Sequence, residues 1–314
     1  MAGLKNIYEE LILFFILNTM KRLFILIFSL ISISGFSNKF EDSVWVSPDS
    51  YYISKGKITT LLNQSHYSNW IAGGVNNVSL TLLLDYDFNL KKGDLEWINR
   101  LDGAYGLVKN QDESIKKNED RLEVYSLLAL KNKGRWSYSA LFNLKSQWSN
   151  GYEYTLNQSG VQDRNLTTKF LSPAYTQIGV GMFYKKDDNF WFNYALLSAR
   201  YIRVNSIFTE NLLDGENYFG VEKGKMGRFE AGGIISAYYK KEIMKNIILE
   251  NKLNLFQNYL EDPLNIDVDY TFSLEMSINK YFSTNLLIQL LYDDNALPEI
   301  QLKEVFGVSF NINF

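Results

Sequence analysis

The chain has 314 residues, of which 46% are hydrophobic and 15% aromatic, and 32 Lys and Arg residues nearly balance 35 Asp and Glu residues, giving a formal net charge of −3 at pH 7. It contains no cysteine and one histidine, which excludes a disulfide framework, a thiolate nucleophile, a cysteine-based metal site and a multi-histidine metal centre. The balanced charge argues against a nucleic-acid binder, and the aromatic content excludes a disordered chain.

A targeting segment comes first in the chain. Lys21 and Arg22 precede the apolar run 23–33, which small residues follow. A basic start, a short apolar run and small residues near a cleavage point are typical of a secretory signal peptide. We therefore predict that residues 1–37 are an N-terminal extension with a signal peptide and that residues 38–56 are a periplasmic segment. A further apolar run upstream leaves a two-part membrane anchor as the alternative.

Beyond the signal peptide, apolar and polar residues alternate over long stretches. In residues 78–90 the even-numbered positions are apolar and most odd-numbered positions are polar, and residues 266–278 repeat the pattern. Successive side chains of a strand point to opposite faces, so each stretch has one apolar and one polar face. Their length approaches the about 9–11 tilted residues with which a strand crosses a bilayer. We predict about twelve strands, near residues 57–67, 77–91, 94–108, 119–131, 135–148, 175–185, 190–203, 228–241, 246–259, 265–278, 281–293 and 299–314.

Short and longer connections alternate between these strands. Tight turns such as Lys92-Gly93 alternate with longer links such as residues 149–174 and 205–227. Outer-membrane barrels have short periplasmic turns and longer external loops, and closure pairs every backbone group within lipid. The predicted fold is therefore all-β, a transmembrane antiparallel up-and-down β-barrel of about 12 strands over residues 57–314. A soluble β-sandwich with its apolar faces in a core is the alternative.

The last strand indicates how the protein reaches its membrane. Apolar residues alternate with Gly, Ser and Asn from Phe306 to the terminal Phe314. Chains that end in an alternating strand with a C-terminal Phe resemble substrates of the outer-membrane assembly machinery, so Phe314 is interpreted as the C-terminal signal of the barrel. The predicted location is the bacterial outer membrane, and the predicted partners are outer-membrane lipid and this machinery, with no nucleic acid.

The polar faces of the strands carry charges of both signs, which would line the lumen. A ring of one sign would suggest ion selectivity, whereas mixed charges suggest ion pairs that fill or narrow the lumen. Whether the lumen is plugged or forms a narrow hydrophilic passage stays open. The predicted lumen charge network comprises Glu96, Arg100, Asp102, Arg121, Glu123, Lys145, Lys185, Arg228, Glu230, Glu250, Lys252, Asp267, Asp269 and Glu275.

Several residues break this two-face pattern. Asn99, Asn251 and Glu304 fall on apolar faces, and the strand at 190–203 supports either register. A β-bulge, or an error in the predicted register, would account for such exceptions. Apolar residues fall on polar faces at Leu83, Ile98, Leu287 and Leu291.

One short motif has the composition of a catalytic site. His66 and Ser68 share one face at the end of the first strand, where a histidine can activate a serine for attack on a lipid ester. The motif resembles the His-X-Ser-Asn sequence of outer-membrane phospholipase A. Carried over, His66 is the base, Ser68 the nucleophile and Asn77 the orienting residue. The glycine that follows the motif in that family, and its Arg-Ser-Trp-Asn-Arg stretch, are absent here.

A wider family resemblance rests on a set of short segments. They are Asn69-Trp70, Gly73-Gly74, 77–80, 105–109, 258–260, 265–268, 292–294 and 306–308. Together they resemble an uncharacterised family of Bacteroidetes outer-membrane proteins, the domain of unknown function 3078, over about residues 55–314. The resemblance implies an outer-membrane location and supplies no catalytic residues.

The predicted function is therefore non-enzymatic, either a small passive channel or a structural and accessory barrel. No cofactor and no metal are predicted. Acidic segments at 261–262 and 292–295 offer oxygen ligands for calcium at an external mouth, although solvated loop acids are the more common case. The alternatives are a lipid hydrolase that uses His66 and Ser68 and a soluble periplasmic β-barrel binding protein.

Overall fold

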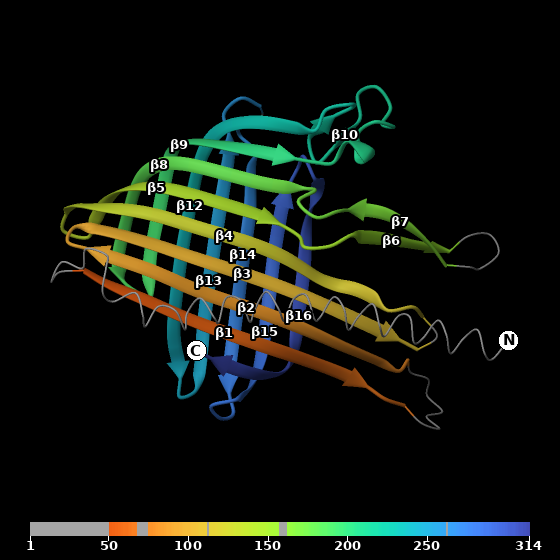
Figure 1. Cartoon of the computed structure of the whole chain (residues 1–314), viewed down its shortest axis with the longest axis horizontal. Coiled ribbons are helices and arrows are strands. Elements are labelled where there is room, and N and C mark those ends of the chain that lie inside the picture. The colour runs from red at the N-terminus through yellow and green to blue at the C-terminus, as the bar shows by residue number, and fades with distance from the viewer. Residues whose placement is uncertain (1–49, 68–74, 112, 157–161, 262) are drawn as a thin grey trace, which may run out of the picture. The chain divides into compact units, whose positions relative to one another are not determined.

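The computed structural model describes residues 50–67, 75–111, 113–156, 162–261 and 263–314 (Figure 1). The predicted signal peptide, residues 1–37, and the residues that follow it to 49 lie outside this part of the chain. Twelve long strands close into one antiparallel barrel, which confirms the predicted fold class. The barrel strands are β1 (Ser50–Ser65), β2 (Asn77–Lys92), β3 (Leu95–Asn110), β4 (Lys116–Lys133), β5 (Trp136–Ser146), β8 (Ala174–Asp187), β9 (Phe190–Arg203), β12 (Gly227–Met244), β13 (Ile247–Asn258), β14 (Ile266–Ser277), β15 (Phe282–Asp293) and β16 (Leu297–Asn313).

The barrel strands follow one another around the ring in chain order, and β1 closes against β16. Short turns join the strands at one end. Gly93 and Gly134 have φ angles of +56° and +63° in these turns, in the left-handed region that glycine adopts without steric cost. The chain enters β1 at the same end, because Ser50 pairs with Lys92 beside the first turn.

The first strand is longer than the alternation predicts. Residues 50–56 belong to β1, so the barrel sheet begins inside the predicted periplasmic segment 38–56. They pair with residues 86–92 of β2. The sequence pattern misses them because residues 51–53 are consecutive apolar side chains that show no alternation.

The two faces of the barrel wall differ in chemistry. Along β4, Leu127 and Ala129 are 0% and 1% exposed, whereas Leu128 and Leu130 are 41% and 51% exposed. Inward positions are therefore covered, and outward positions present apolar side chains that no described residue covers. Exposed hydrophobic side chains on other barrel strands include Tyr138, Phe142, Ile178, Val180, Ile235, Leu302 and Phe306.

Aromatic side chains gather on the outer face at the short-turn end. The ring centroid of Trp136 lies 5.1 Å from that of Tyr184 and 5.6 Å from that of Phe192. The Phe190 ring lies 6.4 Å from Tyr239. These rings come from the neighbouring strands β5, β8, β9 and β12, and they form a band of the kind found where barrels meet a membrane interface.

A β-bulge interrupts β9. Leu196 and Leu197 together occupy the space opposite Gly233 of β12, and both leucines are exposed. The extra residue reverses the alternation, so odd-numbered side chains face inward before the bulge and even-numbered ones after it. The sequence of residues 190–203 supports either register because each register holds for one half of the strand.

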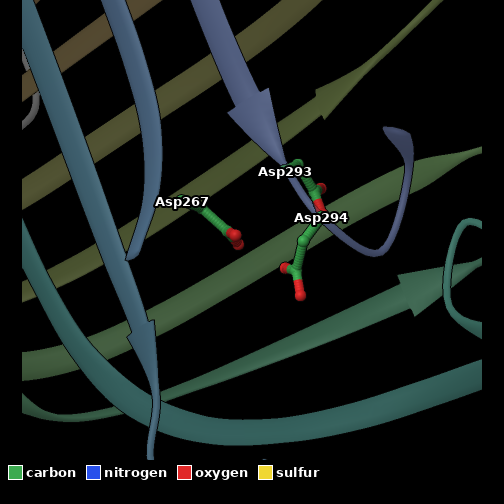
Figure 2. Close-up of side chains that lie close together, drawn as sticks. All are labelled: Asp267, Asp293 and Asp294. Carbon is green, nitrogen blue, oxygen red and sulfur yellow. The ribbon is translucent and has the colours of Figure 1, made fainter. Parts of the chain in front are cut away.

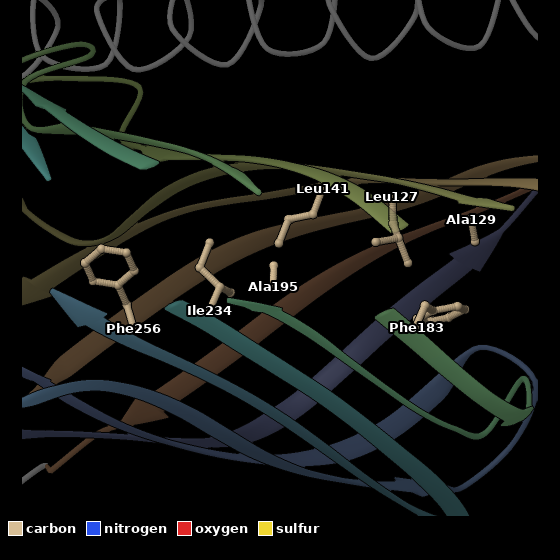
Figure 3. Close-up of a cluster of buried hydrophobic side chains, with 7 residues drawn as sticks. All are labelled: Leu127, Ala129, Leu141, Phe183, Ala195, Ile234 and Phe256. Carbon is tan, nitrogen blue, oxygen red and sulfur yellow. The ribbon is translucent and has the colours of Figure 1, made fainter. Parts of the chain in front are cut away.

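Part of the interior is packed with apolar side chains, which the prediction of a polar inner face did not include. Ile98, one of the predicted exceptions, packs against this cluster. The cluster comes from six consecutive strands, β4, β5, β8, β9, β12 and β13, so it narrows the lumen from one side. Figure 3 shows its buried members, Leu127, Ala129, Leu141, Phe183, Ala195, Ile234 and Phe256.

Two longer connections carry structure outside the barrel, where the sequence suggested plain links. Strands β6 (Gly151–Leu156) and β7 (Gln162–Thr168) form a hairpin that projects from the barrel (Figure 1). The connection from β9 to β12 holds the short helix η1 (Ser206–Phe208) and the strand pair β10 (Asn217–Tyr218) and β11 (Val221–Glu222). In the part of the chain that the structure describes, no helix has the length and apolarity needed to cross a membrane.

Candidate functional site

The candidate site is the barrel lumen, which encloses a cavity of about 1740 Å³. Lys91 and Asp188 line this cavity at the short-turn end, and Glu153 and Phe219 line it at the end of the longer connections. The cavity therefore extends along the length of the barrel.

The structure places most of the predicted lumen charges on the cavity wall. Arg228 and Glu230 are the exceptions among them. Glu230 of β12 is fully buried in the barrel wall beside the end of β9. The Nε of Arg228 lies 3.0 Å from the Oε1 of Glu230. The predicted charges that line the cavity are Glu96, Arg100, Asp102, Arg121, Glu123, Lys145, Lys185, Glu250, Lys252, Asp267, Asp269 and Glu275.

Two ion pairs cross the middle of the lumen. The Nζ of Lys145 on β5 lies 2.6 Å from Asp269 on β14, and four strands separate these two around the ring. The Nζ of Lys252 on β13 lies 3.6 Å from Asp102 on β3, and five strands separate them. In a ring of twelve strands such partners lie on opposite walls, so each pair spans the lumen instead of joining neighbours.

Further ion pairs join distant strands at other heights. Lys57 on β1 lies 2.6 Å from Glu275 on β14, and Lys185 on β8 pairs with Glu96 on β3. The pair Lys303–Glu119, at 2.6 Å, joins β16 to β4. These side chains are partly buried, so water screens each pair less than on an open surface, and the paired side chains act as struts that subdivide the cavity.

Arg200 is a functional candidate that the sequence analysis missed. Its guanidinium is buried, pairs with Glu230, lies 2.5 Å from Asp267 and stacks 4.0 Å from the Phe256 ring centroid. The bulge in β9 turns this residue inward, and the even-numbered register that identifies it holds only beyond the bulge.

Acidic side chains meet beside Arg200 at the loop end of the lumen. Carboxylate oxygens of Asp267, Asp293 and Asp294 lie within 4.8 Å of one another (Figure 2). Asp293 and Asp294 come from one segment proposed for calcium. From the other, Glu261 pairs with Arg228, and residue 262 lies outside the described residues. Within this cluster Arg200 supplies a cation to Asp267, and the same guanidinium is shared with Glu230.

The connection between β9 and β12 packs at the loop end of the lumen, where Phe219 lines the cavity. Val221 is fully buried with Ile202 of β9, and Tyr218 and Phe219 pack against them. Burial raises the pKa of Tyr218, so its hydroxyl stays protonated and donates to the carbonyl of Thr167 in β7. The connection is thereby tied to the β6–β7 hairpin above the lumen.

The described residues do not assemble the predicted hydrolase site. His66 is exposed beyond the end of β1, and Ser68 lies outside the described part of the chain. The side-chain amide of Asn77 donates to the carbonyl of Val75 at 3.5 Å instead of orienting His66. The hydrolase stays an untested alternative.

Phe314, the predicted C-terminal signal, lies at the closure of the barrel. Its backbone N–H donates to the Gly56 carbonyl at 2.9 Å, and the Gly56 N–H donates to the Phe314 carbonyl at 2.7 Å. The Phe314 ring stacks on Tyr86 with the centroids 6.1 Å apart. The terminal residue therefore completes the contact between the first and last strands.

Solved structures with a similar fold are distant. The chain is 7% identical to the translocator domain of autotransporter NalP from Neisseria meningitidis, with a TM-score of 0.36, covering 91% of this chain and 94% of that one. The chain is 9% identical to the COG4313 outer membrane channel from Pseudomonas putida F1, with a TM-score of 0.35, and the match covers 87% of this chain and 97% of that one. It is 8% identical to the KdgM porin in complex with disordered oligogalacturonate, with a TM-score of 0.30, and the match covers 83% of this chain and 98% of that one.

At the sequence level, no curated protein matches the chain. One family model, described as a protein of unknown function (DUF3078), matches residues 62–152. The matched region runs from the end of β1 through β5 into β6, so it covers one side of the barrel wall.

Proposed function

We propose that the protein is an outer-membrane barrel whose lumen is a narrow hydrophilic passage, restricted by ion pairs to water, ions and small solutes. The observation that carries the proposal is the cavity along the barrel, which Lys145–Asp269 and Lys252–Asp102 cross from wall to wall. Mixed charge on the wall favours weak selectivity between anions and cations.

The outer surface supports the membrane location. Leu128, Ile178 and Val180 are between 41% and 55% exposed on barrel strands, whereas the charged side chains face the lumen. A soluble barrel buries its apolar faces and exposes its polar ones, which is the reverse of this arrangement. Lipid would cover the outward side chains, and closure of the sheet leaves the backbone paired within it.

The ion pairs determine how wide the passage is. Lys145 and Lys252 each extend across the lumen, so truncating both side chains removes two struts as well as two charges. The native chain should therefore conduct weakly, and a Lys145→Ala/Lys252→Ala variant should conduct several-fold more.

The test is planar-bilayer recording with the purified full-length chain, after heat-modifiable gel migration has shown a folded barrel. Lys223→Ala is the matched control, because its partner Asp214 lies 2.9 Å away in the exposed connection after β9. Absence of current from both the native chain and the double variant would overturn the passage and leave the structural barrel as the better explanation.

A further inference from the structure

Positive charge gathers at the short-turn end of the barrel. Backbone hydrogen bonds tie the turns at this end to neighbouring strands, as from the Lys131 N–H to the Asp94 carbonyl at 2.8 Å. The exposed acidic residues here are Asp94, Asp187, Asp188 and Glu242. The exposed basic residues are more numerous, namely Lys55, Lys91, Lys92, Lys131, Lys133, Arg135, Lys186, Lys241, Lys245 and Lys280. The formal net charge of the chain is −3, so this positive excess is a property of one end.

Neighbouring lysines on β8 and β12 have different surroundings. Lys185 and Lys240 line the lumen, where each pairs with a glutamate of another strand. Lys186 and Lys241 come next in these two strands, but they are exposed and do not line the cavity. The strands therefore divide their basic residues between the lumen and the outer side of the wall.

The two outward lysines lie just beyond the aromatic band. Lys186 follows Tyr184 by two residues, and Lys241 follows Tyr239 by two residues, toward the turns. The Nη1 of Arg135 donates to the Tyr184 hydroxyl at 3.4 Å, so this guanidinium reaches the same place from β5. Aromatic rings of membrane proteins lie at the depth of the lipid head groups. We call Arg135, Lys186 and Lys241 the outer cation group.

The acids next to these lysines are used within their own turns. Asp187 and Glu242 directly follow Lys186 and Lys241, and each accepts hydrogen bonds from backbone N–H groups of its turn. Within the described residues, the ion pairs at these two turns are made by Lys185 and Lys240, not by the outer cation group. The outer cations are therefore available to an anion from outside the barrel.

The outer cation group lies far from the point where the chain enters the barrel. It spans β5, β8 and β12, and β9 lies between the latter two. Counted around the ring, β9 is the strand opposite β1. The aromatic rings of this sector, Trp136, Tyr184, Phe190, Phe192 and Tyr239, belong to the same four strands. Cations and rings thus form one surface, polar toward the turns and apolar toward the middle of the strands.

We propose that the outer cation group binds the phosphate groups of anionic phospholipid in the leaflet at the short-turn end. A guanidinium and two ammonium groups supply charge-assisted hydrogen bonds to phosphate, and the rings beside them contact the acyl chains. The position beside the aromatic band favours lipid over an acidic protein, which would meet the tips of the turns instead. The inference rests on the membrane location in the proposed function and does not depend on conductance.

The test measures which lipid surrounds the outer cation group. Because the chain has no native cysteine, single fluorophores can be attached at Tyr138→Cys or at Ile178→Cys. Tyr138 is 56% exposed on β5, two residues from Trp136, and Ile178 is 55% exposed on β8 toward the loop end. The labelled barrels are placed in vesicles of phosphatidylcholine and phosphatidylglycerol, with a nitroxide on the acyl chain of one lipid or of the other. The ratio of quenching by the two lipids reports local enrichment.

We expect phosphatidylglycerol to quench several-fold more than phosphatidylcholine at position 138 and about equally at position 178. The preference at position 138 should disappear in about 1 M salt, where charges are screened within about 3 Å. It should also disappear in the variant Arg135→Gln/Lys186→Gln/Lys241→Gln. The control Arg164→Gln/Lys223→Gln/Lys225→Gln removes the same charge from exposed connections at the loop end and should keep the preference.

Two results would overturn the lipid site. Equal quenching by both lipids at position 138 of the native chain would leave the membrane location intact and leave the cations to an acidic protein partner. A preference that survives the triple variant, or survives Lys186→Gln and Lys241→Gln singly if the triple variant does not fold, would show that the outer cation group does not cause it. Absence of quenching by either lipid at both positions would overturn the membrane location, and the lipid site with it.

Discussion

Gly232 of β12, beside the β9 bulge, offers a direct test of how tightly the strands of the barrel wall pack. An added Cβ at Gly232 of β12 would lie 1.9 Å from the carbonyl oxygen of Gln257 on β13. Ordinary contact begins near 3.4 Å, so the backbone of β12 or β13 would have to move by about 1.5 Å (3.4 minus 1.9). Both partners are hydrogen-bonded strands of a closed sheet, which leaves little room for that movement.

Overpacking a well-filled site costs about 1–3 kcal/mol, and a clash with backbone belongs at the upper end of that range. We therefore expect Gly232→Ala to lower the free energy of unfolding by about 3 kcal/mol. With a urea m-value of about 1–3 kcal/mol/M, the midpoint of unfolding should fall by about 1 M or more. The midpoint is measured by heat-modifiable gel migration after incubation in urea.

Gly103→Ala is the matched control, because its Cβ would meet nothing closer than the Trp148 ring at 3.5 Å. Its midpoint should be unchanged or slightly higher, since alanine restricts the unfolded chain. Equal midpoints for Gly232→Ala and Gly103→Ala would refute the packing inferred beside the bulge.

Two further predictions concern the outer face and the buried charges. Leu197→Arg places a cation on the outward side of β9 and should cost about 2–4 kcal/mol in lipid, which is measured as a smaller folded fraction in vesicles. The control Leu213→Arg, at a similarly exposed loop position, should leave the folded fraction unchanged. An equal loss of folded protein in both variants would contradict the lipid-facing assignment of Leu197. Arg200→Ala leaves the fully buried Glu230 with only Arg228 as partner and should lower the free energy of unfolding by about 3 kcal/mol. Arg164→Ala on the exposed hairpin serves as its control, and an unchanged urea midpoint in Arg200→Ala would speak against the buried ion pair.

Alternation predicts the wall of the barrel well because lipid and lumen impose opposite chemistry on neighbouring residues. Leu128 and Leu130 face outward and Leu127 and Ala129 inward, as a period of two requires. The pattern also marks exceptions that have structural reasons. Asn99, on an apolar face, donates its side-chain amide to the Phe88 carbonyl at 3.0 Å where the ladder between β2 and β3 is interrupted.

The arrangement inside the lumen depends on information that no single strand carries. Lys145 and Asp269 can be assigned to inner faces from sequence, but their contact depends on the tilt and stagger of the whole closed sheet. The same holds for Lys303 and Glu119. Alternation read from the start of β9 does not place Arg200 on the inner face, because one inserted residue reverses the alternation before it.

The bulge divides β9 into two halves with opposite alternation of inward and outward side chains. In the first half the odd-numbered residues, such as Trp191 and Asn193, face the lumen, and in the second half the even-numbered residues, such as Arg200 and Ile202, do so. If the chain alternated regularly through Leu196 and Leu197, every residue beyond them would turn to the other face of the wall. Tyr201 would then enter the lumen and the guanidinium of Arg200 would point into lipid, so this one extra residue decides which side of the wall carries the charge.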